Sequence, residues 1–395
     1  MGGRKALLVT RVSGFIPQHR MGDIKILQEM GFEVHYATDL NNVVYGTDNR
    51  RLDGTGVITH QIDFCRSPFS RKVRIAEKQL QRLMSEEKFD LVHCHMPMSG
   101  VVARRAAHRV RKMDGRQVPV LYTAHGFHFC RGVPLKNWLY YPVERFYARY
   151  TDELIVLNDE DYRRACRFPV RGRVAKICGV GIDIQKISPY RKECWRTGNR
   201  TGQADVRKKY HLPEHSAVLV TVGELAPEKN HLAAIEAVAM LRHLDISYLI
   251  CGMGRMEEKL RERVRELHLE DRVCFAGYVE NVPAVLQQCD CFLFPSMREG
   301  LPVAVMEAMA VGLPVIAADI RGCRDLLGKA EHGCLCRKNR AAEYAAEIEK
   351  LFDAKDGERR RRERGSWNRQ MIEKHFSLER SDAQMRAVYS EVLKR

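Results

Sequence analysis

The feature that most constrains the fold is a twenty-residue stretch, residues 291–310, which reads CFLFPSMREGLPVAVMEAMA. Its first four residues are apolar, and such a short run predicts a buried strand. A Pro-Ser turn follows, and the pattern then predicts a helix that begins near Pro302, where the missing N–H of proline costs nothing. A strand, a short loop and a helix in this order are typical of a parallel α/β sheet.

The loop of this stretch has the residues of an anion site. Gly300 lets a ligand approach the backbone closely. The free main-chain N–H groups near Leu301 to Val303, with Pro302 between them contributing none and the helix dipole behind them, favour an anion such as a diphosphate. Glu299 and Glu307 flank this anion site, with seven residues between them. Two carboxylates would repel a phosphate, so we expect them to face hydroxyl groups, which a sugar nucleotide carries on both sides of its diphosphate. The alternative at this point is an ordinary strand–loop–helix unit whose Glu307 faces solvent.

Length and composition indicate a soluble two-domain protein. A chain of 395 residues can form two full cores, and 45% hydrophobic with 29% charged residues is ordinary for globular proteins. No stretch approaches the ~18 apolar residues of a membrane-spanning helix, and the first residues lead into a strand without a signal-peptide pattern. The thirteen cysteines form no CxxC pair. We therefore expect reduced thiols, no metal site and a cytoplasmic location.

The net charge of +16 allows two kinds of anionic partner, nucleic acid or a membrane surface. The basic residues are dispersed and no nucleic-acid-binding motif is present, so nucleic acid is not expected. Residues 99–113 form a predicted helix rich in basic side chains, and we expect its basic face to be solvated, with contact to anionic lipid as the alternative. These side chains are Arg104, Arg105, His108, Arg109, Arg111 and Lys112.

The first half of the chain alternates predicted strands and helices, beginning with strands at residues 5–11 and 33–38, which predicts a doubly wound sheet. Ligands bind beyond the carboxyl ends of such strands, which places Gly14, His19 and His125 on the functional edge. No GxGxxG motif supports a dinucleotide site. Residues 89–95 predict a strand that ends in two histidines. The aromatic residues of a predicted helix at 136–150 are expected to pack in the core or between helices.

The second half starts, after a polar predicted linker at residues 190–203, with a strand at 217–223. Lys229, in the loop after this strand, is placed to neutralise diphosphate charge. Gly252 and Gly254 follow the next strand, where a G-x-G makes backbone contact with a nucleotide plausible. The segment after the following strand contains Val279.

Together, Glu299-x7-Glu307 and the text FPS…EGLPVAVMEAMA resemble the motif of retaining glycosyltransferases of the GT-B fold, the group 1 or family 4 type. The text TAHGFHF…NWLYYPVERFYARYTDELIVLNDED resembles their bacterial exopolysaccharide or capsule branch. The resemblance implies two Rossmann-like, doubly wound α/β domains facing a cleft. Residues 1–185 would bind the acceptor, residues 186–376 would bind the donor, and a helix at 377–395 would cross back to the first domain.

The resemblance also implies a reaction: a retaining hexosyltransferase or N-acetylhexosaminyltransferase that uses a UDP-sugar and no metal. The acceptor would be a lipid-linked glycan on a polyprenyl diphosphate, and the enzyme would lie peripherally on the anionic inner face of the plasma membrane. Two rivals remain, a UDP-sugar epimerase or hydrolase of the same fold and a non-catalytic sugar-nucleotide-binding protein. The non-catalytic alternative is disfavoured because the chain has all four of the family's site residues, Glu299, Glu307, Lys229 and His125.

The roles implied for single residues are specific. His125, Glu299 and Lys229 would act in catalysis, with His125 near the donor sugar and Glu299 on its hydroxyls. Glu307 would hold the ribose, and main-chain groups around Val279 would read uracil. Glu224 stands where the family often has an arginine, a reversal of charge, so Arg298 or another base would supply that cation. No residue is identified as the catalytic base.

Overall fold

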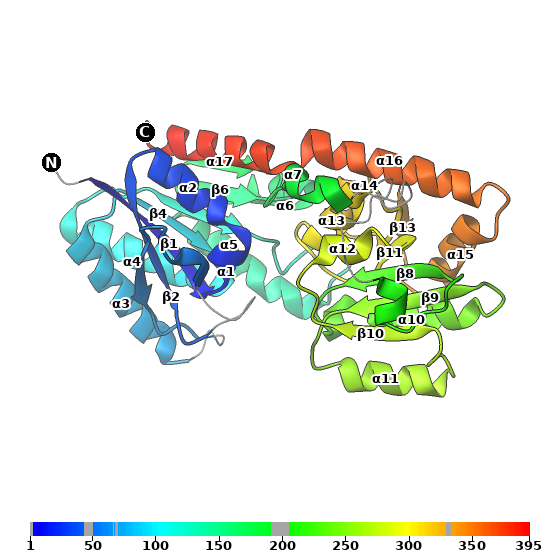
Figure 1. Cartoon of the computed structure of the whole chain (residues 1–395). Helices are drawn as coiled ribbons and strands as arrows, with labels where there is room; N and C mark the ends of the chain where they lie inside the picture. The colour runs from blue at the N-terminus through cyan, green and yellow to red at the C-terminus, as the bar shows by residue number, and fades with distance from the viewer. Residues whose placement is uncertain (1–2, 43–49, 66, 68–69, 191–204, 329–332) are drawn as a thin grey trace. The chain divides into compact units, whose positions relative to one another are not determined.

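A computed structural model gives the structure of the protein and describes residues 3–42, 50–65, 67, 70–190, 205–328 and 333–395. The chain divides into two compact units (Figure 1). The first comprises residues 1–180 and 380–395, and the second comprises residues 181–379. The sequence placed its domain limits at 185/186 and 376/377. Most of the predicted linker, residues 191–203, lies outside the described residues.

The first unit is built on a seven-stranded sheet in the order β3-β2-β1-β4-β5-β6-β7, in which every neighbouring pair is parallel. The central strands are apolar along nearly their whole length because helices cover both faces of a parallel sheet. The strands are β1 (Arg4–Val12), β2 (Phe32–Asp39), β3 (Ile58–Gln61), β4 (Leu91–His95), β5 (Val120–Ala124), β6 (Glu153–Val156) and β7 (Arg173–Lys176).

Helices of the first unit pack through faces that the sequence spacing defines. In α4, the buried Val102, Ala103, Ala106 and Val110 recur at helical spacing, and Gly115 ends the helix with φ 65°. The helices are α1 (Phe15–His19), α2 (Met21–Glu29), η1 (Arg50–Leu52), α3 (Lys72–Glu87), α4 (Pro97–Asp114), η2 (Leu135–Leu139), α5 (Tyr140–Ala148), α6 (Asp159–Ala165) and α17 (Leu378–Val392).

The last helix, α17, packs on the first unit from residue 380 onward (Figure 1). Its Tyr389 hydroxyl lies 2.8 Å from His93 Nδ1, and the other ring nitrogen of His93 lies 2.8 Å from Thr123 Oγ1. Ser381 Oγ donates to the Gly179 carbonyl at 2.6 Å. The final helix therefore completes the hydrogen bonding of a histidine inside the sheet.

The second unit repeats the architecture on a six-stranded parallel sheet in the order β10-β9-β8-β11-β12-β13. Its strands are β8 (Ala217–Val222), β9 (Ile246–Cys251), β10 (Val273–Gly277), β11 (Cys291–Phe294), β12 (Val315–Ala318) and β13 (Cys334–Cys336). Its helices are α7 (Ile184–Ile187), η3 (Ser188–Tyr190), α9 (Val206–Lys209), η4 (Pro227–Lys229), α10 (His231–Met240), α11 (Glu257–Glu266), α12 (Val282–Leu286), α13 (Val303–Val311), α14 (Arg321–Leu327), α15 (Ala341–Phe352) and α16 (Gly357–His375).

The prediction of a solvated basic face at residues 99–113 is wrong for two of its arginines. Arg104 and Arg111 are 1% and 8% exposed. Arg104 forms an ion pair with Glu144 of α5 at 3.0 Å, and Arg111 pairs with Asp152, which precedes β6. Their partners come from other elements, so the periodicity of α4 alone could not reveal them.

The aromatic residues at 136–150, expected in the core or in contacts between helices, are exposed at three of five positions, while Tyr141 packs on the core and Tyr147 is half-buried. Trp138, Tyr140 and Phe146 are 36%, 44% and 44% exposed. The buried residues of α5 are instead Glu144 and Ala148. The helix is held by a buried charge, and much of its aromatic surface faces outward.

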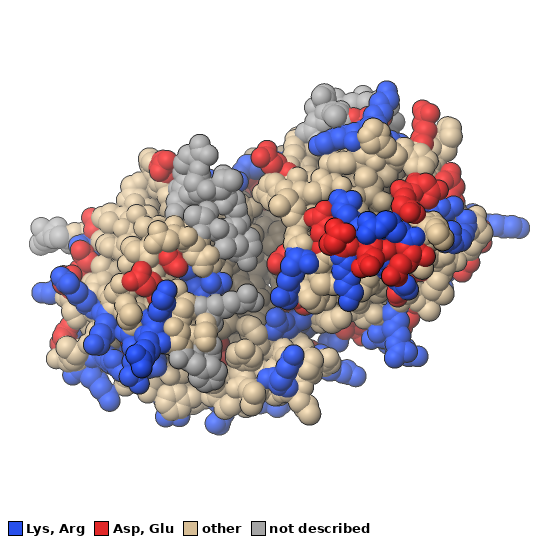
Figure 2. Space-filling model, turned by 90° about the horizontal axis from the view of Figure 1, so that it is seen from below, with Lys and Arg blue, Asp and Glu red and all other residues tan. Residues whose placement is uncertain are grey.

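Lys and Arg side chains are spread over the face shown in Figure 2 rather than gathered in one patch. Among the described residues, no helix is both long and apolar enough to cross a membrane.

Candidate functional site

The loop between β11 and α13 places the first group of candidate residues. The helix begins at Val303, with Pro302 as its N-cap at φ −77° and ψ 114°, and ends before Gly312 at φ 93°. Six of its nine residues are buried, so it lies deep in the second unit. Its first turn leaves backbone N–H groups without partners in the helix. At these groups and the positive end of the helix dipole, beside Leu301 and Pro302, the binding of an anion stays a prediction.

Glu299 and Lys229 meet in this loop. Lys229 Nζ lies 2.5 Å from Glu299 Oε1, and Ser296 Oγ donates to the same oxygen at 2.9 Å. Lys229 ends η4, which follows β8, and β8 pairs with β11. The carboxyl ends of parallel neighbours share one edge of the sheet, so two segments seventy residues apart supply one charged pair.

Glu307 lies in the second turn of α13 and is only half exposed. None of the described residues forms a hydrogen bond or ion pair with its carboxylate, and burial raises the pKa of Glu307 to about 7. A carboxylate held without a partner at the rim of a buried helix can accept hydrogen bonds from ligand hydroxyls. The half-buried Glu307 is therefore not a fully solvated residue, and its contact with ligand hydroxyls stays a prediction.

Gly252 and Gly254 have a structural explanation. Their φ angles are 147° and 159°, and a Cβ on Gly252 would lie 1.8 Å from the Gly223 carbonyl oxygen. A Cβ on Gly254 would lie 2.6 Å from the Leu225 carbonyl oxygen. The close approach of the loops after β8 and β9 thus requires both glycines, and their contact with a nucleotide stays a prediction.

The remaining predicted site residues of the second unit are exposed or lie in loops. Glu224 is exposed, and its carbonyl oxygen lies 3.2 Å from His231 Nε2. Arg298 is half-buried, Val279 is half-buried after β10, and Gly300 is buried within the loop. These positions leave the side chains of Glu224 and Arg298 accessible to a ligand.

Sequence reasoning missed Arg321, which begins α14. It is 3% exposed, and its Nε donates to the main-chain oxygen of Glu299 at 2.8 Å. A buried guanidinium bound to the loop between β11 and α13 fixes the backbone of Glu299 and adds positive charge to this part of the unit. No sequence motif indicates this contact of Arg321, because it depends on the pairing of β11 with β12 and not on spacing along the chain.

His125, the candidate of the first unit, follows β5 and takes part in a chain of polar contacts in which the two histidines are hydrogen-bonded to each other. Its Nε2 lies 3.1 Å from Nδ1 of His95, the last residue of β4, and Nε2 of His95 lies 3.9 Å from a carboxylate oxygen of Asp23. Arg20 holds that carboxylate through two N–H groups at 2.8 and 2.5 Å. The ring of Phe15 packs edge-on against His125, with 4.8 Å between the ring centroids.

One of the two rings donates to the other through the contact between His95 Nδ1 and His125 Nε2. Burial, together with the charge of Arg20, holds the pKa of His95 and His125 well below the usual range, so both rings are neutral near pH 7.

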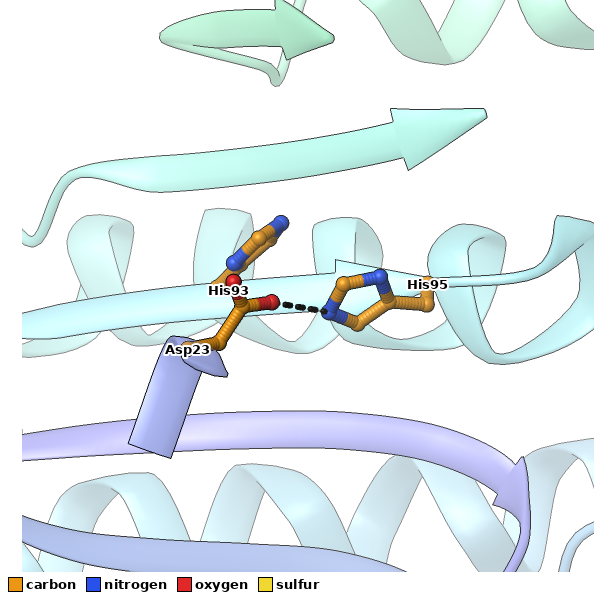
Figure 3. Close-up of side chains that lie close together, drawn as sticks. All are labelled: Asp23, His93 and His95. Atoms are coloured by element: carbon orange, nitrogen blue, oxygen red, sulfur yellow. Dashed lines mark ion pairs between the residues drawn. The ribbon is translucent and has the colours of Figure 1, made fainter. Parts of the chain in front are cut away.

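Asp23, His93 and His95 place ligand atoms within 4.8 Å of one another, and Figure 3 shows their side chains converging from α2 and β4. Two histidines and a carboxylate are a possible metal-ligand set. Here the carboxylate is already bound by Arg20, and hydroxyl groups lie within hydrogen-bonding distance of both ring nitrogens of His93. A metal ion would have to displace these interactions beside a buried guanidinium, so the contacts favour a structural hydrogen-bonded cluster.

Gly14 and His19 lie at the two ends of α1, on the edge expected for them. The buried Gly14 is the N-cap, and its carbonyl accepts a hydrogen bond from the Gln18 amide at 3.1 Å. Burial, with nearby Arg20 and Arg51, lowers the pKa of His19 to about 4. His19 therefore offers a neutral imidazole to any ligand of this edge.

Two parallel α/β units of this kind define the GT-B class of glycosyltransferase, and solved structures agree. A glycosyltransferase from Rickettsia africae ESF-5 matches with a TM-score of 0.74 at 17% identity, covering 100% of both chains. Anabaena HepE, solved in complex with UDP and glucose, matches with a TM-score of 0.73 at 17% identity, covering 98% of this chain and 100% of that one.

Sequence comparisons identify the family. Residues 19–178 match the glycosyl transferase 4-like domain, and residues 202–367 match the glycosyl transferases group 1 family. The glycosyltransferase EpsD of Bacillus subtilis (strain 168) is 34% identical over 353 residues, 88% of this chain and 87% of that protein. An Escherichia coli protein named UDP-Gal:alpha-D-GlcNAc-diphosphoundecaprenol alpha-1,3-galactosyltransferase is 30% identical over 70% of both chains. The chain belongs to the group 1 glycosyltransferases.

Proposed function

We propose that this enzyme transfers a hexosyl or N-acetylhexosaminyl group from a UDP-sugar to a glycan carried on a polyprenyl diphosphate, with retention of anomeric configuration. One observation carries the proposal. The free N–H groups that begin α13 lie in one unit with the Lys229–Glu299 pair and with the unpartnered carboxylate of Glu307. An anion site between two carboxylates fits a diphosphate that has a sugar on each side.

Each part of the donor has a matching group. The backbone N–H groups of Leu301 and Val303 and Nζ of Lys229 would bind the diphosphate. The carboxylate of Glu299, oriented by Ser296 and Lys229, would accept hydrogen bonds from the transferred sugar. Glu307 would accept hydrogen bonds from the ribose. Main-chain groups around Val279 would read the uracil base.

In the reaction, the bond between the anomeric carbon and the β-phosphate oxygen breaks, and an acceptor hydroxyl oxygen bonds to that carbon and loses its proton. Negative charge accumulates on the departing UDP. Lys229 and the α13 N–H groups would stabilise this charge because they are already oriented before the reaction. His125 would take part in the transfer step as a neutral ring. We propose that this charge stabilisation operates without a metal ion.

The comparisons support the choice of donor and acceptor. The Escherichia coli relative is named for a UDP-linked sugar and a diphosphoundecaprenol acceptor, and the HepE structure contains UDP and glucose. Such an acceptor has a lipid tail, so the enzyme would work peripherally at the anionic inner face of the plasma membrane.

A donor screen tests the proposal by measuring nucleotide release with and without a bacterial lipid extract. We expect UDP release from one UDP-sugar, strongly stimulated by the extract, with label appearing in the lipid phase. Glu299→Gln is the matched control and should lose most of the release. UDP-sugar turnover without any acceptor would indicate the epimerase or hydrolase, and UDP binding without turnover under any condition would indicate a binding protein.

A further inference from the structure

The surface of η2 and α5 carries an unusual concentration of exposed apolar side chains. Of the fourteen large hydrophobic residues exposed in the described part of the chain, six lie between residues 135 and 146. Leu135 is 87% exposed and Leu139 is 73% exposed. Single exposed apolar residues are normal, but a cluster of them marks an interaction site. The other four are Trp138, Tyr140, Val143 and Phe146.

The contacts of α5 explain why these residues face outward. Its inward face carries Glu144, whose carboxylate bonds to Arg104 and to the Tyr122 hydroxyl, each at 3.0 Å. Leu139, Val143 and Phe146 are spaced at i, i+4 and i+7, which aligns them along one stripe away from that anchor. A buried charge thus fixes the orientation of the helix, and the apolar stripe is left at the surface.

The exposed charged side chains within residues 131–149 have one sign, and the neighbouring Glu160 of α6, which accepts from the Arg131 amide, is paired with Arg164. Arg131, Lys136, Arg145 and Arg149 are all exposed, and no ion pair connects them to an acidic group among the described residues. The guanidinium of Arg149 lies over the Phe146 ring, 4.4 Å from its centroid. Glu144 is the one acidic residue between positions 131 and 149, and it is buried. The surface is therefore apolar and cationic, without exposed negative charge of its own.

The basic helix α4 is the competing candidate on the same unit, and its charges are largely neutralised. Arg105 and Arg109 both pair with the buried Glu77, at 3.0 and 3.1 Å. Arg104 and Arg111 are buried in ion pairs. Helix α4 therefore offers fewer free cations than its sequence indicates, and no comparable apolar stripe accompanies them.

We propose that residues 131–149 form a docking surface for an anionic lipid bilayer. The apolar stripe would enter the boundary between headgroups and acyl chains, as an amphipathic interfacial helix does. The four basic side chains would contact anionic headgroups, and Trp138 and Tyr140 are of the type enriched at membrane interfaces. This docking surface would bring the enzyme to its lipid-linked acceptor, and in that respect the inference rests on the proposed function. A protein partner is the alternative occupant, and the unpaired cations around the stripe favour lipid.

Vesicle co-sedimentation with the full chain tests this surface. The vesicles contain phosphatidylcholine alone or with 30% phosphatidylglycerol by design, at roughly 0.1 M and 1 M salt, where the Debye length falls from about 10 to 3 Å. We expect binding to the anionic vesicles that weakens at high salt. Lys136→Glu/Arg145→Glu and Leu139→Ser/Phe146→Ser should each lower the bound fraction by at least about ten-fold.

Matched controls carry equal changes elsewhere. Arg71→Glu/Lys72→Glu makes the same change of charge at the start of α3, and Met113→Ser/Met240→Ser removes apolar groups that are 67% and 56% exposed. Both controls should bind vesicles like the wild type, and UDP affinity of all variants should be unchanged. Three results would each overturn the proposal. The α3 control could lose as much vesicle binding as the surface variants, both surface variants could bind like the wild type, or the wild type could show no preference for anionic vesicles. Because vesicle binding needs no nucleotide, its failure is distinguishable from failure of UDP binding or sugar transfer.

Discussion

The pH dependence of UDP binding is the prediction that depends most closely on the structure. Burial raises the pKa of Glu307 to about 7, so its carboxyl group changes charge within the physiological range. Ribose hydroxyls donate to the ionised form. From that pKa, about nine-tenths of the protein is ionised at pH 8 and about one-tenth at pH 6.

The magnitude follows from these populations. If UDP binds only the ionised form, the apparent Kd is the intrinsic Kd divided by the ionised fraction, so it should rise about ten-fold from pH 8 to pH 6. UDP has a phosphate pKa of about 6, which adds its own pH dependence. Glu307→Gln keeps the size of the side chain but has no carboxyl group whose charge changes with pH. The ratio of the wild-type Kd to the variant Kd therefore isolates Glu307.

Isothermal titration calorimetry with UDP at several pH values measures this ratio. We expect it to rise about ten-fold between pH 8 and pH 6. The variant should also bind more weakly than the wild type at pH 8, by roughly ten- to one hundred-fold for hydrogen bonds to a charged group. A ratio that does not change with pH, or equal affinities at pH 8, would refute the assignment of Glu307 to the ribose.

Three further predictions concern other residues. Glu299→Gln should lower kcat for sugar transfer by about ten-fold or more and leave UDP affinity within a few-fold; calorimetry and UDP release together check this, and a large loss of UDP affinity would contradict it. His125→Ala should likewise lower kcat with little change in UDP affinity; wild-type turnover would return His125 to a packing role. Arg104→Met leaves the buried Glu144 without its ion-pair partner and should destabilise the protein by about 3–5 kcal/mol. Thermal or denaturant unfolding measures this, with the half-exposed Arg105→Met as the milder control.

Much of the fold could be predicted because local patterns determine it. The apolar run at residues 291–294 is strand β11 with the predicted limits, the strand predicted before Gly252 is β9, and the Gly-Leu-Pro sequence leads into α13. These strands are buried on both faces, so they are continuous apolar runs whose ends are visible in the sequence. The GT-B class predicted from the motif is confirmed by the two parallel sheets and the solved neighbours.

The errors arose where a side chain is paired across the fold. Arg104 and Arg111 look like surface residues in the sequence, but Glu144 and Asp152 neutralise them from other elements. The outward aromatic residues of α5 follow from the same ion pair, since Glu144 takes the inward position. Such pairs depend on tertiary contacts that hydrophobic periodicity does not record.

The residues of the candidate site also fall into those that the sequence predicted and those that only the tertiary contacts reveal. Sequence spacing identified Glu299, Lys229 and Glu307 as candidates, and the order of β8 and β11 brings the first two together. The contact of Arg321 with the Glu299 backbone has no sequence signal. The chain from Asp23 through His95 to His125 had only a weak signal, the two histidines that end β4.

A crystal structure of the protein with UDP tests the central claim most directly. We predict that the diphosphate lies at the N-terminus of α13 with Lys229 within hydrogen-bonding distance, and that the ribose hydroxyls contact the carboxylate of Glu307. Density for UDP elsewhere in the second unit, or a ribose that makes no contact with Glu307, would contradict the assignment of this loop and helix as the nucleotide-sugar site.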